Sequence, residues 1–285
     1  MNTVLFGVSV LGALGIVFGL ILAVAAKVFA VETDERQEAI AAALPGANCG
    51  GCGFAGCSAY AAAIVLSSET PITSCAAGGK AAVNEIARIM GIEAEETVKK
   101  VALVKCSGTS GTAKRNFDYS GIYDCTAALR LGGGKGPNEC PQSCLGMGSC
   151  VEACLYGAIE VKDGVASVNS EKCIGCTACV KMCPKKVIVM IPYSAKVTVA
   201  CNSAQKGGIL RKFCDIGCIG CKMCEKACET GAIEVVDNLA AIDFDKCTSC
   251  GKCAVKCPRH VIRSSGAATE IEAPTTAPDA ETEPE

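Results

Sequence analysis

The sequence has a single histidine, His260, no tryptophan, and aromatic residues at only 4% of its 285 positions. One histidine excludes a haem held by two imidazoles, and it excludes repeated zinc sites that pair two thiolates with two imidazoles. The scarcity of aromatic residues argues against stacking on nucleic-acid bases. The sequence therefore gives no sign of a haem held by two histidines or of a nucleic-acid binder.

Nucleotide-binding and catalytic motifs are also missing. No Gly-x-Gly-x-x-Gly sequence follows an expected strand. The glycine-rich stretch at 131–136 lacks the Ser or Thr that follows the lysine of a P-loop, so we expect a flexible turn there. No constellation of serine, histidine and carboxylate residues indicates catalysis. Any substrate chemistry is therefore expected on a partner.

Cysteine is abundant instead, with 24 in the chain. Disulfide scaffolds of such density are short secreted chains, whereas this chain is long and its cysteines are clustered along the sequence. Clustered free thiols suit metal coordination in a reducing compartment. All-thiolate zinc sites remain one alternative.

Two cysteine runs carry the strongest signal. Residues 173–184 read CIGCTACVKMCP and residues 247–258 read CTSCGKCAVKCP, and both match the spacing of bacterial 4Fe–4S ferredoxins. Each run has an upstream partner, and residues 140–263 form an internal repeat with an offset of 74 residues. Short β-rich runs are expected at 158–161, 165–168, 233–236 and 239–242. The fold class predicted is α+β, with two tandem modules of the bacterial-ferredoxin type.

In that architecture the fourth cysteine of each run binds the neighbouring cluster. The first module is then expected to hold one cluster on Cys140, Cys144, Cys150 and Cys183, and a second on Cys154, Cys173, Cys176 and Cys179. The second module is expected to use Cys218, Cys221, Cys224 and Cys257, and then Cys228, Cys247, Cys250 and Cys253.

The upstream runs depart from the regular spacing. Cys144 and Cys150 are separated by five residues, and Met147 occupies the position that Cys221 has in the second repeat. Leu155 and Glu229 replace the usual proline, and Cys214 could serve in place of Cys221. Four cysteines are left over, and we hypothesise that they bind a sixth cluster, the alternative being free thiols in the core. These four are Cys106, Cys125, Cys201 and Cys214.

A separate group precedes the repeat. It consists of Cys49, Cys52, Cys57 and Cys75 within a glycine-rich sequence, and it predicts a single 4Fe–4S site. Cys57 is expected to open a helix at 58–67 with Ser58 as a plausible cap, and a second helix is expected at 80–90. A helix N-terminus favours a thiolate.

The N-terminus predicts a membrane anchor. Val4 to Ala26 is an uncharged stretch of 23 residues, which as a helix would extend roughly 34 Å. A cleaved signal peptide is the rival, but residues 1–3 carry no basic residue. Lys27 and Arg36 follow the stretch, so the positive-inside rule places the N-terminus outside and the cluster domains in the cytoplasm.

The net charge of −2 conceals an uneven distribution. Residues 266–285 contain six acidic residues and no basic one, which predicts a disordered acidic tail. Residues 170–263 are basic, and this charge either balances the clusters or forms a docking face for an acidic partner. For such docking we favour the distal repeat because of its basic residues Lys222, Lys226, Lys252, Lys256 and Arg259.

These features divide the chain into six segments. They are a transmembrane anchor (1–27), a small α-rich single-cluster 4Fe–4S domain (28–100), a connector (101–139), a first ferredoxin-like module (140–195), a second one (196–263) and the tail (264–285).

The order of motifs carries a specific resemblance. An apolar N-terminal segment, LPGANCGGCGFAGC at 44–57, VKCSG at 104–108, YSGIYDC at 119–125 and the later ferredoxin runs follow one another. The chain closely resembles the B subunits of the Rnf ion-translocating oxidoreductase complexes, in their long, cysteine-rich form, over roughly residues 1–263. The residues predict a single-pass subunit of the cell membrane with five or six 4Fe–4S clusters, and the resemblance implies an electron-input subunit. Such a subunit takes electrons from reduced ferredoxin and relays them to the other membrane and peripheral subunits of a Na+- or H+-translocating ferredoxin:NAD+ oxidoreductase. It has no catalytic site of its own beyond electron transfer.

Two other functions remain open. One is a polyferredoxin subunit of a membrane hydrogenase or formate dehydrogenase, against which the group at 49–75 argues. The other is a scaffold protein held together by all-thiolate zinc.

Overall fold

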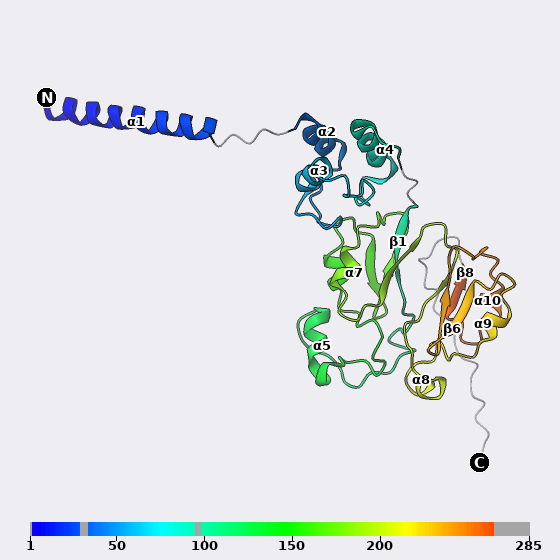
Figure 1. The fold of residues 1–285 in the computed structure, drawn as a ribbon. Helices are drawn as coiled ribbons and strands as arrows, with labels where there is room; N and C mark the ends of the chain where they lie inside the picture. Colours follow the sequence, from blue (N-terminus) through cyan, green and yellow to red (C-terminus); the bar gives the residue numbers. More distant parts are fainter. Residues whose placement is uncertain (1, 29–33, 95–97, 265–285) are drawn as a thin grey trace, which may run out of the picture.

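The computed structural model describes residues 2–28, 34–94 and 98–264. Within these residues, helices form the N-terminal part, and four two-stranded antiparallel sheets with short helices between their strands form the rest (Figure 1). The predicted acidic tail lies outside the described residues, apart from its first residue. Where the chain is described, the architecture is the mixture of helices and short strands expected for ferredoxin-like modules.

The first helix, α1, spans Asn2–Val28. Large apolar side chains along it are exposed, among them Leu11, Ile16 and Leu22. Among the described residues, no helix has both the length and the hydropathy required to cross a membrane. The transmembrane role expected for residues 1–27 therefore stays a prediction.

Three helices form a small N-terminal domain: α2 (Glu35–Ala43), α3 (Cys57–Leu66) and α4 (Gly79–Met90). Ile40, Tyr60 and Ile86 are almost fully buried at its centre. Asp34 caps α2 by accepting a hydrogen bond from the backbone N–H of Arg36 at 2.9 Å. The expected helices at 58–67 and 80–90 are thus confirmed to within one residue at each end.

Two local expectations in the helical segments are wrong. Ser58 does not cap α3, because the helix already begins at Cys57 and Ser58 lies inside it. The glycine-rich stretch at 131–136 is not simply a turn, because α5 (Cys125–Gly134) continues into it. Asp124 starts that helix by accepting a hydrogen bond from the Ala127 N–H at 2.7 Å, and the helix then ends where Gly133 and Gly134 take positive φ values.

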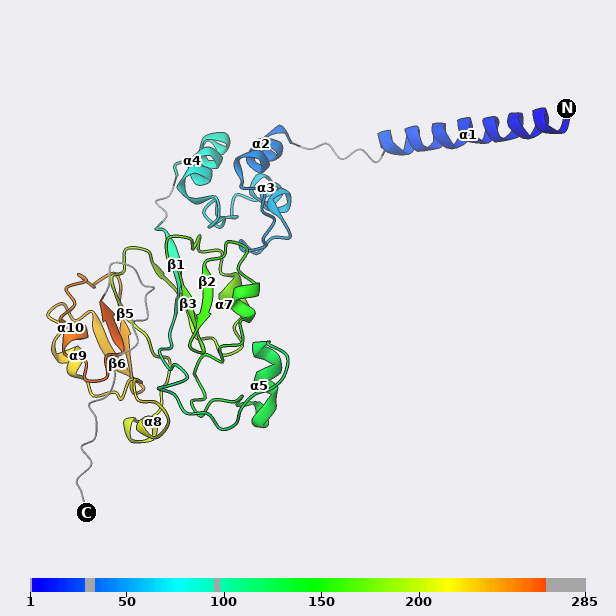
Figure 2. The ribbon, with the colours of Figure 1, turned by 180° about the vertical axis from the view of Figure 1, so that it is seen from behind.

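The first repeat contains two small sheets. Strands β2 (Ile159–Lys162) and β3 (Val165–Val168) form a hairpin, and α6 (Ser149–Glu152) and α7 (Ala178–Met182) precede and follow it. Strand β4 (Ile188–Pro192) pairs with β1 (Lys100–Val104), which comes from the start of the connector. The connector and the first repeat therefore share a sheet and a core. Figure 2 shows β1 beside the hairpin strands β2 and β3.

The second repeat copies this plan. Strands β6 (Ile233–Val236) and β7 (Leu239–Ile242) form its hairpin, flanked by α9 (Met223–Lys226) and α10 (Lys252–Val255). Strand β8 (Ile262–Ser264) pairs with β5 (Val197–Val199), and α8 (Gly207–Phe213) lies between β5 and the cysteine loops. Ile233, Leu239 and Ile262 follow Ile159, Val165 and Ile188 by the 74-residue offset, so the structure reproduces the sequence repeat.

Candidate metal-cluster sites

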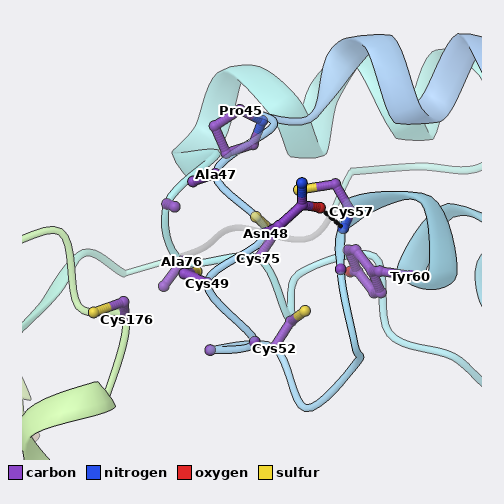
Figure 3. Close-up of a pocket in the computed structure, with 14 residues that line it drawn as sticks. Pro45, Ala47, Asn48, Cys49, Cys52, Cys57, Tyr60, Cys75, Ala76 and Cys176 are labelled. Atoms are coloured by element: carbon purple, nitrogen blue, oxygen red, sulfur yellow. Dashed lines mark hydrogen bonds between the residues drawn. The ribbon is translucent and has the colours of Figure 1, made fainter. Parts of the chain in front are cut away.

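The N-terminal site gathers Cys49, Cys52, Cys57 and Cys75 around a hollow at the base of α3 (Figure 3). Asn48 shapes this loop, since its Oδ1 accepts a hydrogen bond from the Cys57 N–H at 2.8 Å and so takes the place of a helix cap. Gly78 lies against the site, and a Cβ built there would be 3.5 Å from the Cys75 sulfur and 2.5 Å from the Ala82 Cβ. The four predicted cysteines are therefore brought together.

A second domain reaches this hollow. Cys176, from the loop before α7, also lines it, and a Cβ on Gly51 would lie only 2.6 Å from the Cys176 carbonyl oxygen. The glycine thus permits direct backbone contact between the N-terminal domain and the first repeat.

Cys176 belongs to a set that we call the first-repeat outer site, with Cys154, Cys173 and Cys179. The Ala102 N–H of β1 points to the Cys173 sulfur at 3.4 Å, and the Ala158 N–H points to the Cys154 sulfur at 3.3 Å. Amide donors of this kind accompany the thiolates of iron–sulfur clusters. The predicted set is brought together here as well.

The first-repeat inner site differs from the prediction. Its hollow is lined by Cys125, Cys144, Cys150 and Cys183, whereas Cys140 lies elsewhere. Cys125 opens α5 and is held in place because its N–H donates to the Ser149 hydroxyl at 2.7 Å. The Ser149 hydroxyl in turn donates to Asp124 at 2.8 Å.

The internal repeat explains this exchange. The second repeat supplies a cysteine at Cys221, where the first repeat has Met147. Cys125 from the connector fills the resulting gap. The 74-residue offset could have predicted this exchange, because it makes Cys140 equivalent to Cys214. The expected sets nevertheless placed Cys140 in the first inner site and left Cys214 for the sixth.

The central site contains Cys106, Cys140, Cys201 and Cys214. Three of these were expected to form a sixth site, and Cys140 replaces the expected Cys125. Cys106 follows β1 and Cys201 follows β5, so corresponding strands of the two halves each deliver one thiol. A Cβ on Gly108 would lie 3.7 Å from the Cys106 sulfur and 3.9 Å from that of Cys214, so the backbone closes tightly around the site.

The second repeat has an inner and an outer site. The second-repeat inner site is lined by Cys218, Cys221, Cys224 and Cys257, so Cys221 lies in the predicted set and Cys214 does not. For the second-repeat outer site, Cys253 lies near enough to Cys228 and Cys247 for their charges to interact. Cys250, the fourth expected member, is exposed on the loop between Cys247 and Cys253.

Burial governs the protonation of many of these thiols. Burial raises the pKa of Cys106, Cys150 and Cys179 to about 12, and that of Cys224 to about 11. At neutral pH such thiols keep their protons unless a cation compensates the thiolate charge. Iron supplies that compensation, so cluster binding releases protons from the buried sites.

The donor chemistry fits iron–sulfur clusters. Five of the sites surround open hollows of similar size, about 330–390 Å³. Four thiols line each of them, and Cys176 is a fifth at the N-terminal hollow. Amide N–H groups point at the sulfurs of Cys154, Cys173 and Cys201. Across the described residues, no three Cys, His, Asp or Glu side chains form a group that could hold a single metal ion.

The sites form a series. Cys150 of the first inner site interacts electrostatically with Cys179 of the first outer site, and Cys106 of the central site does so with Cys144. The Cys218 N–H points to the Cys201 sulfur at 3.4 Å and joins the second inner site to the central one. Thiols of the two sites in the second repeat share one core. The order thus runs from the N-terminal site through the first repeat and the central site to the second-repeat outer site.

Family models match three parts of the chain. A model described as "Putative Fe-S cluster" matches residues 44–85, a 4Fe-4S binding domain matches residues 166–189, and a 4Fe-4S dicluster domain matches residues 217–261. The first covers the N-terminal site, and the other two cover the main cysteine runs of the repeats. The fold and the sites together define an iron–sulfur protein of the multi-cluster 4Fe–4S class.

Relatives extend the match over nearly the whole chain. The B subunit of the Na(+)-translocating ferredoxin:NAD(+) oxidoreductase complex of Acetobacterium woodii is 46% identical over 92% of this chain and 78% of its own. The B subunit of the proton-translocating ferredoxin:NAD(+) oxidoreductase complex of Clostridium ljungdahlii is 42% identical over 95% of this chain and 96% of its own. The B subunit of the ion-translocating oxidoreductase complex of Methanosarcina acetivorans is 42% identical over 92% of this chain and 99% of its own. The chain belongs to the family of B subunits of the ion-translocating oxidoreductase (Rnf) complexes, which confirms the resemblance found in the sequence.

Proposed function

We propose that this protein holds six 4Fe–4S clusters and relays electrons along them, as a subunit of an ion-translocating ferredoxin:NAD+ oxidoreductase complex. The observation that carries this proposal is the series of five hollows lined by cysteines, continued by the interaction of Cys253 with Cys228 and Cys247. With Cys250 as the fourth member of the last set, the six sets use all 24 cysteines. When bound, such clusters accept and release one electron at a time. The chain contributes the thiols, the amide donors and the spacing between neighbouring sites.

Electrons enter at the second-repeat outer site. Cys250 is exposed there, whereas its equivalent in the first repeat, Cys176, is covered by the N-terminal domain at Gly51. In the first repeat this surface is covered by the N-terminal iron–sulfur domain. In the second repeat the equivalent surface is open. A reduced ferredoxin, which is a small iron–sulfur protein of that kind, is the electron donor that fits.

The basic residues of this region contribute unequally to docking. Lys226 and Lys256 are exposed in the second repeat and suit an acidic partner. Lys222 forms an ion pair with Glu225 at 3.7 Å, and Lys252 forms one with Glu229. Arg259 points inward, with its Nη2 donating to the Cys214 carbonyl at 2.7 Å, so it does not belong to the docking face favoured from the sequence.

Electrons leave at the N-terminal site for the membrane part of the complex. This site is at the opposite end of the series and belongs to the domain that follows α1 in the chain. We propose that α1 anchors the subunit as a single span of the bilayer, with the N-terminus outside and the cluster domains in the cytoplasm. Its uncharged stretch of 23 residues and its exposed apolar side chains support this role.

Ion transport belongs to other subunits. The proposed span contains no ionisable residue between Val4 and Ala26, so it offers no site for a moving ion. The names of the relatives specify Na+ in one and protons in another. The coupling ion is therefore set outside this chain.

The proposal predicts the metal content of the isolated protein. We expect about 24 iron atoms per chain, four for each of six sites, with absorbance near 400 nm that dithionite bleaches. Reduced ferredoxin should bleach the same band. A content of about 20 would remove one site, and colourless protein that contains zinc would reject the assignment altogether.

The membrane role is tested by removing α1. A chain that begins at residue 34 should keep its full iron content but remain in the supernatant when membranes are sedimented, because the apolar anchor is lost. The full chain expressed in parallel is the control. Truncated protein that sediments with the membranes as fully as the control would show that contacts with other subunits, rather than α1, hold it there.

A further inference from the structure

The central site differs from the others in the charge around it. Each of its four thiols interacts electrostatically with a cation, Cys201 with Lys105, Cys140 with Lys185, Cys214 with Arg259 and Cys106 with Arg263. At the other sites, the charges that act on buried thiols come from other thiols. Cations are not confined to the central site, since Lys185 also lines the first-repeat inner hollow and Lys222 and Arg259 line the second-repeat inner hollow. This arrangement is not required by the ferredoxin spacing.

Hydrogen bonds fix these cations in place. Arg263 Nη2 donates to the buried Ser107 hydroxyl at 2.7 Å, and Ser107 donates to the Ala200 carbonyl at 3.1 Å. Lys185 Nζ donates to the Lys135 and Pro141 carbonyls at 2.8 and 2.9 Å. Lys105 lines the hollow itself.

The four charges are not neutralised by ion pairs. Over residues 34–94 and 98–264, no ion pair joins any of them to a carboxylate. Asp215, an exposed carboxylate beside Cys214, offsets part of the positive charge. Arg259 also keeps a buried Nε without a hydrogen-bond partner, and its side chain lines the hollow of the second-repeat inner site.

We propose that the central site is the most easily reduced of the six, an electron-holding position in the middle of the series that the surrounding cations create. The inference rests on the proposed six-cluster function. A cluster with four thiolates carries roughly −2 when oxidised and gains one negative charge on reduction. Fixed cations in a partly buried site are only weakly screened by salt, so they favour the reduced state.

This placement has a consequence for electron flow. An electron that enters at the exposed second-repeat outer site is drawn inward to a site enclosed by both halves of the molecule. It is then held away from the exposed Cys221 and Cys250. Delivery to the N-terminal site follows when the membrane part of the complex can accept it.

The test is a redox titration of the full-length iron-loaded protein followed by electron paramagnetic resonance. One site should become reduced at a higher potential than the others, and Cys201→Ser should alter that step. Arg263→Gln should lower the ratio of reduced to oxidised cluster in that step by about tenfold at fixed potential, equivalent to about 59 mV for one electron. Arg263→Lys should recover part of the loss, and Arg211→Gln, an exposed arginine on α8, should change nothing.

The outcomes are distinguishable. If Arg263→Gln retains its iron and leaves the step unchanged, or if Cys201→Ser alters a different step, the inference is overturned. If Arg263→Gln loses about four iron atoms, Lys105→Gln, at the lysine that lines the central hollow, is titrated in its place. Loss of iron in both would show that the cations retain the cluster rather than set its potential, which also overturns the inference. A wild-type content of about 20 iron atoms instead rejects the six-site proposal itself.

Discussion

Replacing Cys57 by alanine should abolish electron flow from reduced ferredoxin to NAD+ in the assembled complex. Cys57 is one of four thiols in the N-terminal site, which ends the series on the side of the proposed membrane anchor. The variant should lose about four iron atoms, because one site then lacks a ligand. The other five sites should still be reduced by ferredoxin, since they lie on the entry side of the break.

Ser58→Ala is the matched control. Ser58 follows Cys57 in α3, is exposed, and does not line the hollow. Iron content and electron flow should therefore match the wild type. Activity that persists in Cys57→Ala with the expected loss of iron would mean that electrons leave the series at another site, and the proposed direction would have to be abandoned.

The hairpins and the cysteine runs of the repeats could be predicted because each is formed by residues close together in the sequence and each occurs twice. The expected strands at 165–168, 233–236 and 239–242 coincide with β3, β6 and β7, and the one at 158–161 is displaced by a single residue. Hydrophobic alternation and turn residues determine such hairpins within a few positions. The two complete cysteine runs were readable for the same reason, since their ligands lie within eleven residues of one another.

The ligands that come from distant segments were harder to assign. Cys125 and Cys140 both precede the first run, and their spacing does not tell which of them reaches Cys144. That choice depends on α5 and on the Asp124–Ser149 hydrogen bond, which links residues 25 positions apart. Crossing of the fourth ligand places Cys183 with Cys144 and Cys154 with Cys173, as the hollows do, but it assumed that each module supplies all its own thiols.

The positions of the cations could not be predicted either. In the sequence, Arg259 follows Cys257-Pro258 and resembles the exposed lysines around it. Its inward direction depends on the Cys214 carbonyl, which belongs to a loop 45 residues earlier. The basic residues of this sequence therefore divide into exposed ones, such as Lys226 and Lys256, and inward ones, such as Arg259.

Double replacements of cysteine decide between the expected and the observed ligand sets. In the structure Cys125 shares a site with Cys144, and Cys140 shares one with Cys201. Cys125→Ala combined with Cys144→Ala should thus lose about four iron atoms, no more than either single variant, because both changes affect one site. Cys125→Ala combined with Cys201→Ala should lose about eight, because the changes affect two sites.

The sets expected from the sequence predict the reverse. Placing Cys125 with Cys201 gives a loss of about four iron atoms for that pair and about eight for Cys125 with Cys144. The matching pairs with Cys140 provide an internal check. If the sets seen in the structure are right, Cys140→Ala with Cys201→Ala should lose about four iron atoms, and Cys140→Ala with Cys144→Ala should lose about eight. The comparison depends on which thiols share a site and not on the stability of any single variant, so a uniform loss of iron across all four pairs would contradict both groupings.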